Sequence, residues 1–161
     1  PCLVKKDSYI GNVDGVMNVV ITEGSPVGES VLQGEGAGPG PTTSALMSDL
    51  LSILRGNIKF PFGIPSYKRR NIISFNFNNY INSLYLRFEV KDKPGVLSQI
   101  TNQLAKKNIS VQRLIQIPNK NKTASIIIIT HKTEEFSAQS CIERLNKLKN
   151  ILKAPTVIRL L

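Results

Sequence analysis

Residues 85–97 read Tyr85-Leu86-Arg87-Phe88-Glu89-Val90-Lys91-Asp92-Lys93-Pro94-Gly95-Val96-Leu97, and they decide the fold. Apolar and polar side chains alternate over the first six residues, which is the pattern of a strand with one buried face. Residues 92–95 include an adjacent proline and glycine and predict a turn. Apolar residues then recur at helical spacing and predict a helix directly after the turn. They are Val96, Leu97, Ile100, Leu104 and Ala105.

The residues downstream continue this alternation of strands and helices. Residues 109–117 and 124–130 predict two strands joined by a turn, and the second contains four successive isoleucines, which suit a strand buried on both faces. Glu134 opens a second helix, and residues 156–161 predict a last strand. The order strand, helix, strand, strand, helix, strand is that of a ferredoxin-like βαββαβ fold, with one antiparallel sheet and both helices on one face.

A glycine-rich stretch lies upstream and reads Gly34-Glu35-Gly36-Ala37-Gly38-Pro39-Gly40-Pro41-Thr42-Thr43-Ser44-Ala45. Apolar residues at helical spacing behind it predict a helix over residues 41–55. A glycine loop that enters a helix N-terminus offers free N–H groups and a positive dipole end, which favour a polar or anionic ligand. The same pattern also suits a plain structural turn. It has neither the dinucleotide spacing G-x-G-x-x-G nor the Gly-Lys-Ser/Thr of a nucleoside-triphosphate loop.

The residues ahead of the glycine stretch predict a β-hairpin. Residues 15–22 form a nearly continuous apolar run, residues 24–26 predict a turn, and residues 27–33 predict a second strand. Asn18 either satisfies the backbone at a strand edge or has a functional role.

The chain therefore divides into three parts, and its predicted fold class is α+β. Residues 1–60 form a partial α/β domain built of the hairpin, the glycine loop and a helix. Residues 61–80 are a linker, in which the basic residues 68–70 are a solvated surface patch, and residues 81–161 are the ferredoxin-like unit.

The net charge of +10 over 161 residues makes nucleic acid a candidate partner. The basic residues form small separate clusters, however, and aromatic residues do not interleave with them as base-stacking platforms would. We therefore expect no nucleic-acid partner; steep salt-dependent binding to DNA or RNA would restore that alternative. No apolar run approaches the roughly 20 residues that a membrane helix needs, so we expect no membrane partner.

The two cysteines and the single histidine predict neither a metal site nor a catalytic site. Cys2 and Cys141 are isolated in the sequence and indicate a reducing compartment, the cytoplasm, and no metal site. His131 is a polar residue at a strand end rather than a base. The sequence contains no Ser/His/Asp arrangement and no supported carboxylate pair, so it predicts no catalytic residue.

The glycine-rich stretch resembles a segment of homoserine dehydrogenases, whose pattern is Gly-x-Gly-Ala-Gly-x-x-Pro-Thr-x-Ser-Ala followed by Asp-Leu. Thr43 stands where alanine is frequent. The hairpin resembles the family at residues 13–18 and 27–29. The matching residues of the glycine pattern are Gly34, Gly36, Ala37, Gly38, Pro41, Thr42, Ser44, Ala45, Asp49 and Leu50.

This resemblance implies an NAD(P)-dependent enzyme that interconverts L-homoserine and L-aspartate 4-semialdehyde in threonine, methionine and isoleucine biosynthesis. The nucleotide-binding fold and the catalytic residues would lie upstream of this segment, so residues 1–161 alone should show no turnover. The hairpin strands would also take part in subunit pairing. The residues implied to lie near the nicotinamide are Gly36, Ala37 and Gly38, with Glu35 and Thr42.

The turn at residues 92–97 resembles the first loop of ACT domains, which are regulatory modules that bind amino acids. Residues 109–110 and 127–131 are also similar to the family. The resemblance implies a homo-oligomer, at least a dimer, and an amino-acid effector, threonine by analogy. Two alternatives stay open: the turn has a purely structural or assembly role, or the chain is a stand-alone ACT module without catalysis. The implied effector-binding residues are Asp92, Pro94, Gly95, Val96 and Leu97.

Overall fold

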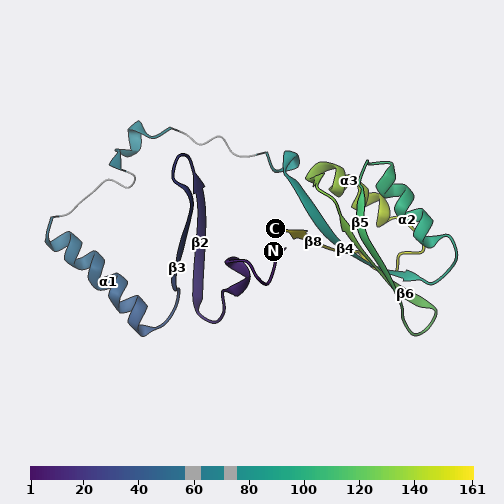
Figure 1. Cartoon of the computed structure of the whole chain (residues 1–161), viewed down its shortest axis with the longest axis horizontal. Helices are drawn as coiled ribbons and strands as arrows, with labels where there is room; N and C mark the ends of the chain where they lie inside the picture. Colours follow the sequence, from purple (N-terminus) through teal and green to yellow (C-terminus); the bar gives the residue numbers. More distant parts are fainter. Residues whose placement is uncertain (57–62, 71–75) are drawn as a thin grey trace. The chain divides into compact units, whose positions relative to one another are not determined.

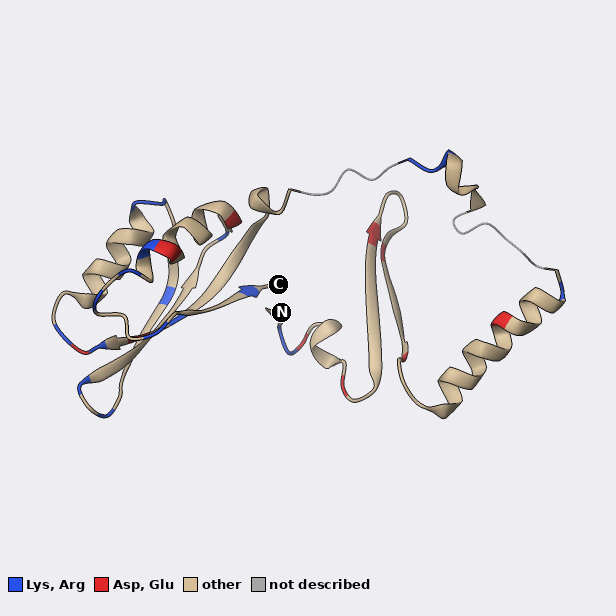
Figure 2. Ribbon diagram, turned by 180° about the vertical axis from the view of Figure 1, so that it is seen from behind, with Lys and Arg blue, Asp and Glu red and all other residues tan. Residues whose placement is uncertain are grey.

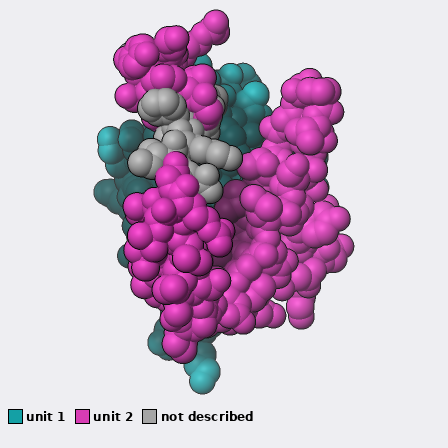
Figure 3. All heavy atoms as spheres, turned by 90° about the vertical axis from the view of Figure 1, so that its left-hand side faces the viewer, with its two compact units in different colours: residues 1–4, 74–161 teal, residues 5–73 magenta. Residues whose placement is uncertain are grey.

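The computed structural model describes residues 1–56, 63–70 and 76–161. It divides into two compact units, coloured in Figure 3: residues 1–4 with 74–161, and residues 5–73. We refer to them as the first and the second unit. Residues 57–62 and 71–75 of the predicted domain end and linker lie outside the described residues.

The first unit is built on one mixed sheet in the order β1-β8-β4-β6-β5. Its centre is β4, which pairs antiparallel with both β6 and β8, and β1 adds a parallel strand beside β8. The short strand β7 pairs with the start of β4. The bounds are β1 Cys2–Leu3, β4 Ile81–Lys91, β5 Val111–Pro118, β6 Thr123–Thr130, β7 Thr133–Glu134 and β8 Thr156–Leu160.

Two helices, α2 (Val96–Ala105) and α3 (Glu135–Leu145), cover one face of this sheet (Figure 1). The alternation within β4 points Leu86, Phe88 and Val90 into the core beneath them. The ferredoxin-like fold predicted from the sequence is confirmed. The remaining core residues are Leu84, Val96, Ile100, Leu104, Ile109, Ala124, Ile126, Ile128, Ala138, Cys141 and Leu145.

The prediction that the isoleucines of β6 are buried on both faces is wrong. Ile126 and Ile128 are 1% and 0% exposed, whereas Ile127 and Ile129 are only half-buried. The reason is that successive strand residues point to opposite faces and the helices cover one face only. The other face of the sheet is therefore apolar but partly open to solvent.

The second unit consists of a hairpin followed by a helix. Strand β2 (Met17–Gly24) pairs antiparallel with β3 (Gly28–Glu35), which confirms the predicted hairpin, and α1 runs over Pro39–Leu54. Short 3-10 turns lie at Ile10–Asn12 and Ser66–Lys68. None of the described residues of this unit is buried, and α1 exposes large apolar side chains. They include Leu46, Met47, Leu50, Leu51, Ile53 and Leu54.

Basic residues lie on several separate turns and strand ends, as Figure 2 shows. Within the described part of the chain, no helix has both the length and the apolar character that crossing a membrane requires.

Candidate functional sites

The glycine loop connects β3 to α1, as the sequence predicted, but the helix begins at Pro39, two residues before the expected start. Gly38 precedes the helix with a φ of 125°, a conformation that side-chain-bearing residues rarely adopt. The Thr42 N–H donates to the Gly38 carbonyl at 3.2 Å and closes the first turn. The free N–H groups of the helix start therefore lie next to the loop.

Gly36 is needed for a different reason, which is close approach. A Cβ on this residue would lie 1.9 Å from Nδ2 of Asn18, so a larger side chain cannot fit without a shift. The Gly36 N–H donates to the Val16 carbonyl at 2.7 Å and extends the hairpin pairing by one step. Asn18, whose role the sequence left open, thus packs directly against the loop.

A surface cavity of about 350 Å³ opens beside this loop. Three of the five predicted cofactor residues line it, namely Glu35, Gly36 and Thr42; Ala37 and Gly38 belong to the same turn but do not line the cavity. The sequence matched Asp49 to a motif without assigning it to the site, and its place in the lining follows from helical spacing behind Thr42. The other lining residues are Pro41, Ala45 and Leu46.

Two carboxylates, Glu35 and Asp49, set the charge of this cavity. They would repel phosphate groups despite the helix N-terminus nearby, because like charges at short range raise the energy of both. They would favour a neutral polar or cationic group.

A second cavity, of about 380 Å³, lies at the turn between β4 and α2. Gly95 starts the helix with a φ of 85°, and the Val96 N–H donates to the Lys93 carbonyl at 3.3 Å. All five predicted effector residues line this cavity. The full lining is Val90, Lys91, Asp92, Lys93, Pro94, Gly95, Val96, Leu97, Gln116 and Ile126.

Gln116 is a lining residue that the sequence analysis missed. Its side-chain amide donates to Oδ1 of Asp92 at 3.3 Å. It lies 24 residues downstream on β5, and only its register opposite Ile126 of β6 brings it to the cavity. The cavity thus presents cationic Lys91 and Lys93, an anionic carboxylate and an amide together, a set that can meet both charges of a free amino acid.

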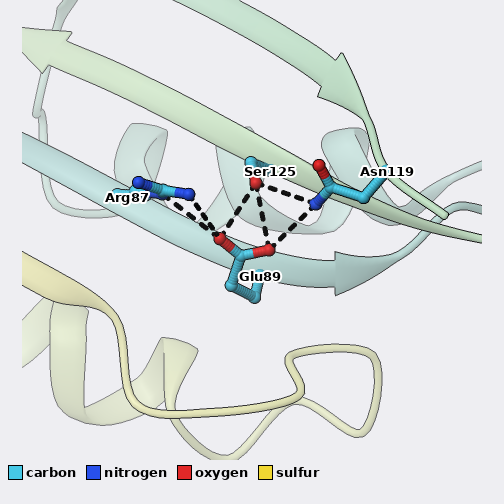
Figure 4. Close-up of polar contacts among 4 residues, drawn as sticks. All are labelled: Arg87, Glu89, Asn119 and Ser125. Atoms are coloured by element: carbon cyan, nitrogen blue, oxygen red, sulfur yellow. Dashed lines mark hydrogen bonds and ion pairs between the residues drawn. The ribbon is translucent and has the colours of Figure 1, made fainter.

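A polar network fixes the open face of the sheet near this end (Figure 4). Glu89 accepts hydrogen bonds from Ser125 at 2.9 Å, Asn119 at 3.1 Å and Arg87 at 3.2 Å. These contacts tie β4 to β6 and to the turn between β5 and β6. Donors within the protein itself occupy the acceptor positions of the Glu89 carboxylate, so we assign this network a structural role.

Among the described residues, no cluster of three His, Cys, Asp or Glu could hold a metal ion. Cys2 is exposed and Cys141 is buried, and both are free thiols. Burial raises the pKa of the Cys141 thiol, which leaves it a packing residue.

The βαββαβ unit has the fold class of ACT domains, and residues 84–150 match the family model "ACT domain". Residues 1–51 match the model "Homoserine dehydrogenase". The two family models thus match successive parts of the chain, residues 1–51 and residues 84–150.

Similar proteins cover the whole chain. Homoserine dehydrogenases from Neisseria gonorrhoeae and Helicobacter pylori are each 35% identical over 99% of this chain. A crystal structure of a homoserine dehydrogenase from Thiobacillus denitrificans matches 100% of the chain at 30% identity, with a TM-score of 0.84. The chain spans 38% of the length of each of these relatives.

Proposed function

We propose that this chain is the C-terminal portion of a homoserine dehydrogenase that interconverts L-homoserine and L-aspartate 4-semialdehyde with NAD(P). The observation that carries the proposal is the similarity over the whole chain together with an accessible cavity at the glycine loop. The two free cysteines agree with a cytoplasmic enzyme. The amino acids threonine, methionine and isoleucine would be the end products of its pathway.

The role proposed for the glycine loop is to hold the nicotinamide end of the cofactor. The cofactor, when bound, supplies the hydride chemistry. Gly36 and Gly38, with Ala37 between them, leave the loop backbone free of large side chains where the nicotinamide would approach it. The Thr42 hydroxyl offers a hydrogen bond at the start of α1. Glu35 contributes negative charge that suits the oxidised ring.

The apolar surface of the second unit supports a position within a larger domain. None of its described residues is buried, so α1 and the hairpin build no core by themselves. Exposed apolar surface of this size is normally covered in a folded protein. We therefore expect residues 1–161 alone to show no dehydrogenase turnover.

The function proposed for the first unit is to bind an amino acid at the cavity of residues 92–97. The ligand carboxylate would meet Lys91 or Lys93 and the N–H groups at the start of α2, and its ammonium group would meet Asp92. Threonine is the expected effector, since it is an end product of the proposed pathway. A stand-alone ACT module without catalysis is the second candidate, because this unit contains a complete core.

Isothermal titration of residues 1–161 with threonine, lysine, methionine and isoleucine tests the binding proposal. We expect heat with threonine and a loss of at least about tenfold in affinity in Asp92→Asn, because a charge-assisted contact with the ligand ammonium group is removed. Asp14→Asn, at an exposed carboxylate of the other unit, is the matched control. Absence of heat with all four amino acids would refute effector binding and favour an assembly role.

Pairing with a second copy would cover the open face of the sheet. That face carries half-buried Ile127 and Ile129 and exposed Ile115 and Ile117, and β5 lies at the sheet edge. Exposed apolar faces and strand edges favour association. Sedimentation should show a dimer that dissociates in Ile117→Asp; a monomeric wild type would refute this interface.

A further inference from the structure

Two segments of the chain that lie far apart in the sequence are both held at the end of β8. The second unit, called the inserted unit below, lies in the sequence between residues 1–4 and the residues that lead into β4. Each of these flanking segments belongs to the first unit, called the ACT unit below because residues 84–150 match that family model. Each also contacts the segment of β8 that contains Arg159.

The flanking segment at the start of the chain is held by strand pairing. Cys2 and Leu3 lie parallel to Arg159 and Leu160, and the Leu161 N–H donates to the Leu3 carbonyl at 3.0 Å. This strand has only two residues, so its attachment depends on β8 keeping its shape at that end.

The flanking segment before β4 is held by side chains. Phe77, in the 3-10 turn η4 (Phe77–Asn79), stacks on Tyr80 with 5.4 Å between ring centroids. The guanidinium carbon of Arg159 lies 4.8 Å from the centroid of Phe77, within cation–π range. The Glu135 N–H donates to the Tyr80 carbonyl at 2.8 Å. Arg159 thus contacts both flanking segments, one through its backbone and one through its side chain.

Glu135 anchors Arg159 at this position. Its carboxylate is buried, with the residue 4% exposed, and accepts from Nε of Arg159 at 3.0 Å and from Nη2 of the same guanidinium. Asn82 at 3.0 Å and Gln139 at 3.2 Å complete its partners. A two-pronged charge-assisted pair of this kind fixes geometry as well as adding energy.

We propose that the Glu135–Arg159 pair is a clamp that fastens to β8 both segments that flank the inserted unit in the sequence, residues 1–4 and the described residues that lead into β4. Both segments share one anchor, and loosening it loosens both. The inference does not depend on which ligand the chain binds.

Amide hydrogen exchange measured by NMR on residues 1–161 tests the clamp. The Leu161 amide reports on the β1 attachment, the Glu135 amide reports on the Tyr80 attachment, and the Ile126 amide reports on global opening. In Arg159→Met we expect the first two amides to exchange at least about tenfold faster relative to Ile126, since charge-assisted hydrogen bonds are lost. Arg87→Met, which breaks the exposed pair with Glu89, is the matched control and should leave both unchanged.

Two further variants keep the test decisive. Arg159→Lys retains the charge but loses the two-pronged contact, and it serves if the methionine variant does not fold; the same joint increase is expected. Phe77→Leu should accelerate the Glu135 amide while sparing the Leu161 amide. Acceleration of only one of the two amides in the Arg159 variants, or of neither, would overturn the proposal.

Discussion

Glu135 is a buried charged residue of the ACT unit. It is nearly fully buried, and hydrogen bonding to Arg159 lowers the pKa of its carboxyl below the ordinary value of 4.5. This contact outweighs the opposing effect of burial, and hydrogen bonds from Asn82 and Gln139 lower the pKa further by smaller amounts. The same contact raises the pKa of the Arg159 guanidinium. A buried pair of this kind is costly to break on one side only.

The lowered pKa of Glu135 predicts how stability changes with pH. The folded protein holds this proton less tightly than the unfolded chain, so the contribution is complete above pH 4.5 and is lost as the pH falls below it. Glu135→Gln should lower the free energy of unfolding by about 1–3 kcal/mol at neutral pH, because charge-assisted hydrogen bonds to the half-buried Arg159 are lost. It should also show a smaller loss of stability between about pH 6 and pH 3. Urea unfolding at several pH values measures both.

Glu134→Gln is the control for this prediction, because it changes an adjacent carboxylate that is exposed. Its unfolding free energy should stay close to that of the wild type at every pH. Equal acid sensitivity in wild type and Glu135→Gln would show that the pair does not carry the effect.

The contact between Gly36 and Asn18 gives a second prediction at this scale. Gly36→Ala should weaken the end of the hairpin by about 1–3 kcal/mol, because the new Cβ overlaps the Asn18 amide. In the Asn18→Ala background the same substitution should cost much less, because the obstacle is gone. Amide exchange along β2 and β3 in the four proteins of this cycle measures the coupling; additive effects would contradict the contact.

At the scale of elements, β6 shows which structural features a sequence pattern can predict and which it cannot. Four successive isoleucines predicted a strand correctly, but the prediction that both its faces are buried was wrong, because coverage depends on where the helices pack. The position of Gln116 has the same cause, since strand register and not sequence spacing brings it to Asp92. The turn at residues 92–97 was predictable because its proline and glycine act locally.

The one-sided burial of β6 can be tested by a matched pair of substitutions. Ile126→Ala removes a side chain from beneath the helices and should cost about 2–5 kcal/mol of unfolding free energy. Ile127→Ala, one residue away on the half-open face, should cost clearly less because its cavity is open to solvent. Chemical denaturation compares them directly, and equal losses would indicate a strand covered on both faces.

At the scale of the whole molecule, the two units differ in what they contain. The ACT unit has a core, a charged cavity and a clamp, whereas the described residues of the second unit include none that is buried. The sequence located the glycine loop through its motif, but the lining role of Asp49 and the packing of Asn18 became visible only once the strands and helix were in place. We interpret the second unit as part of a domain that needs further residues to close.

The most direct test of this account is an assay of homoserine-dependent NAD or NADP reduction by the protein expressed with any residues encoded upstream of Pro1, beside residues 1–161 alone. We predict turnover by the longer protein and none by residues 1–161, because the proposed role of the glycine loop is to form one wall of the site and not to supply its catalytic groups. The longer protein should lose activity in Gly36→Ala. A longer protein that is folded but inactive with both cofactors, or turnover by residues 1–161 alone, would contradict the account.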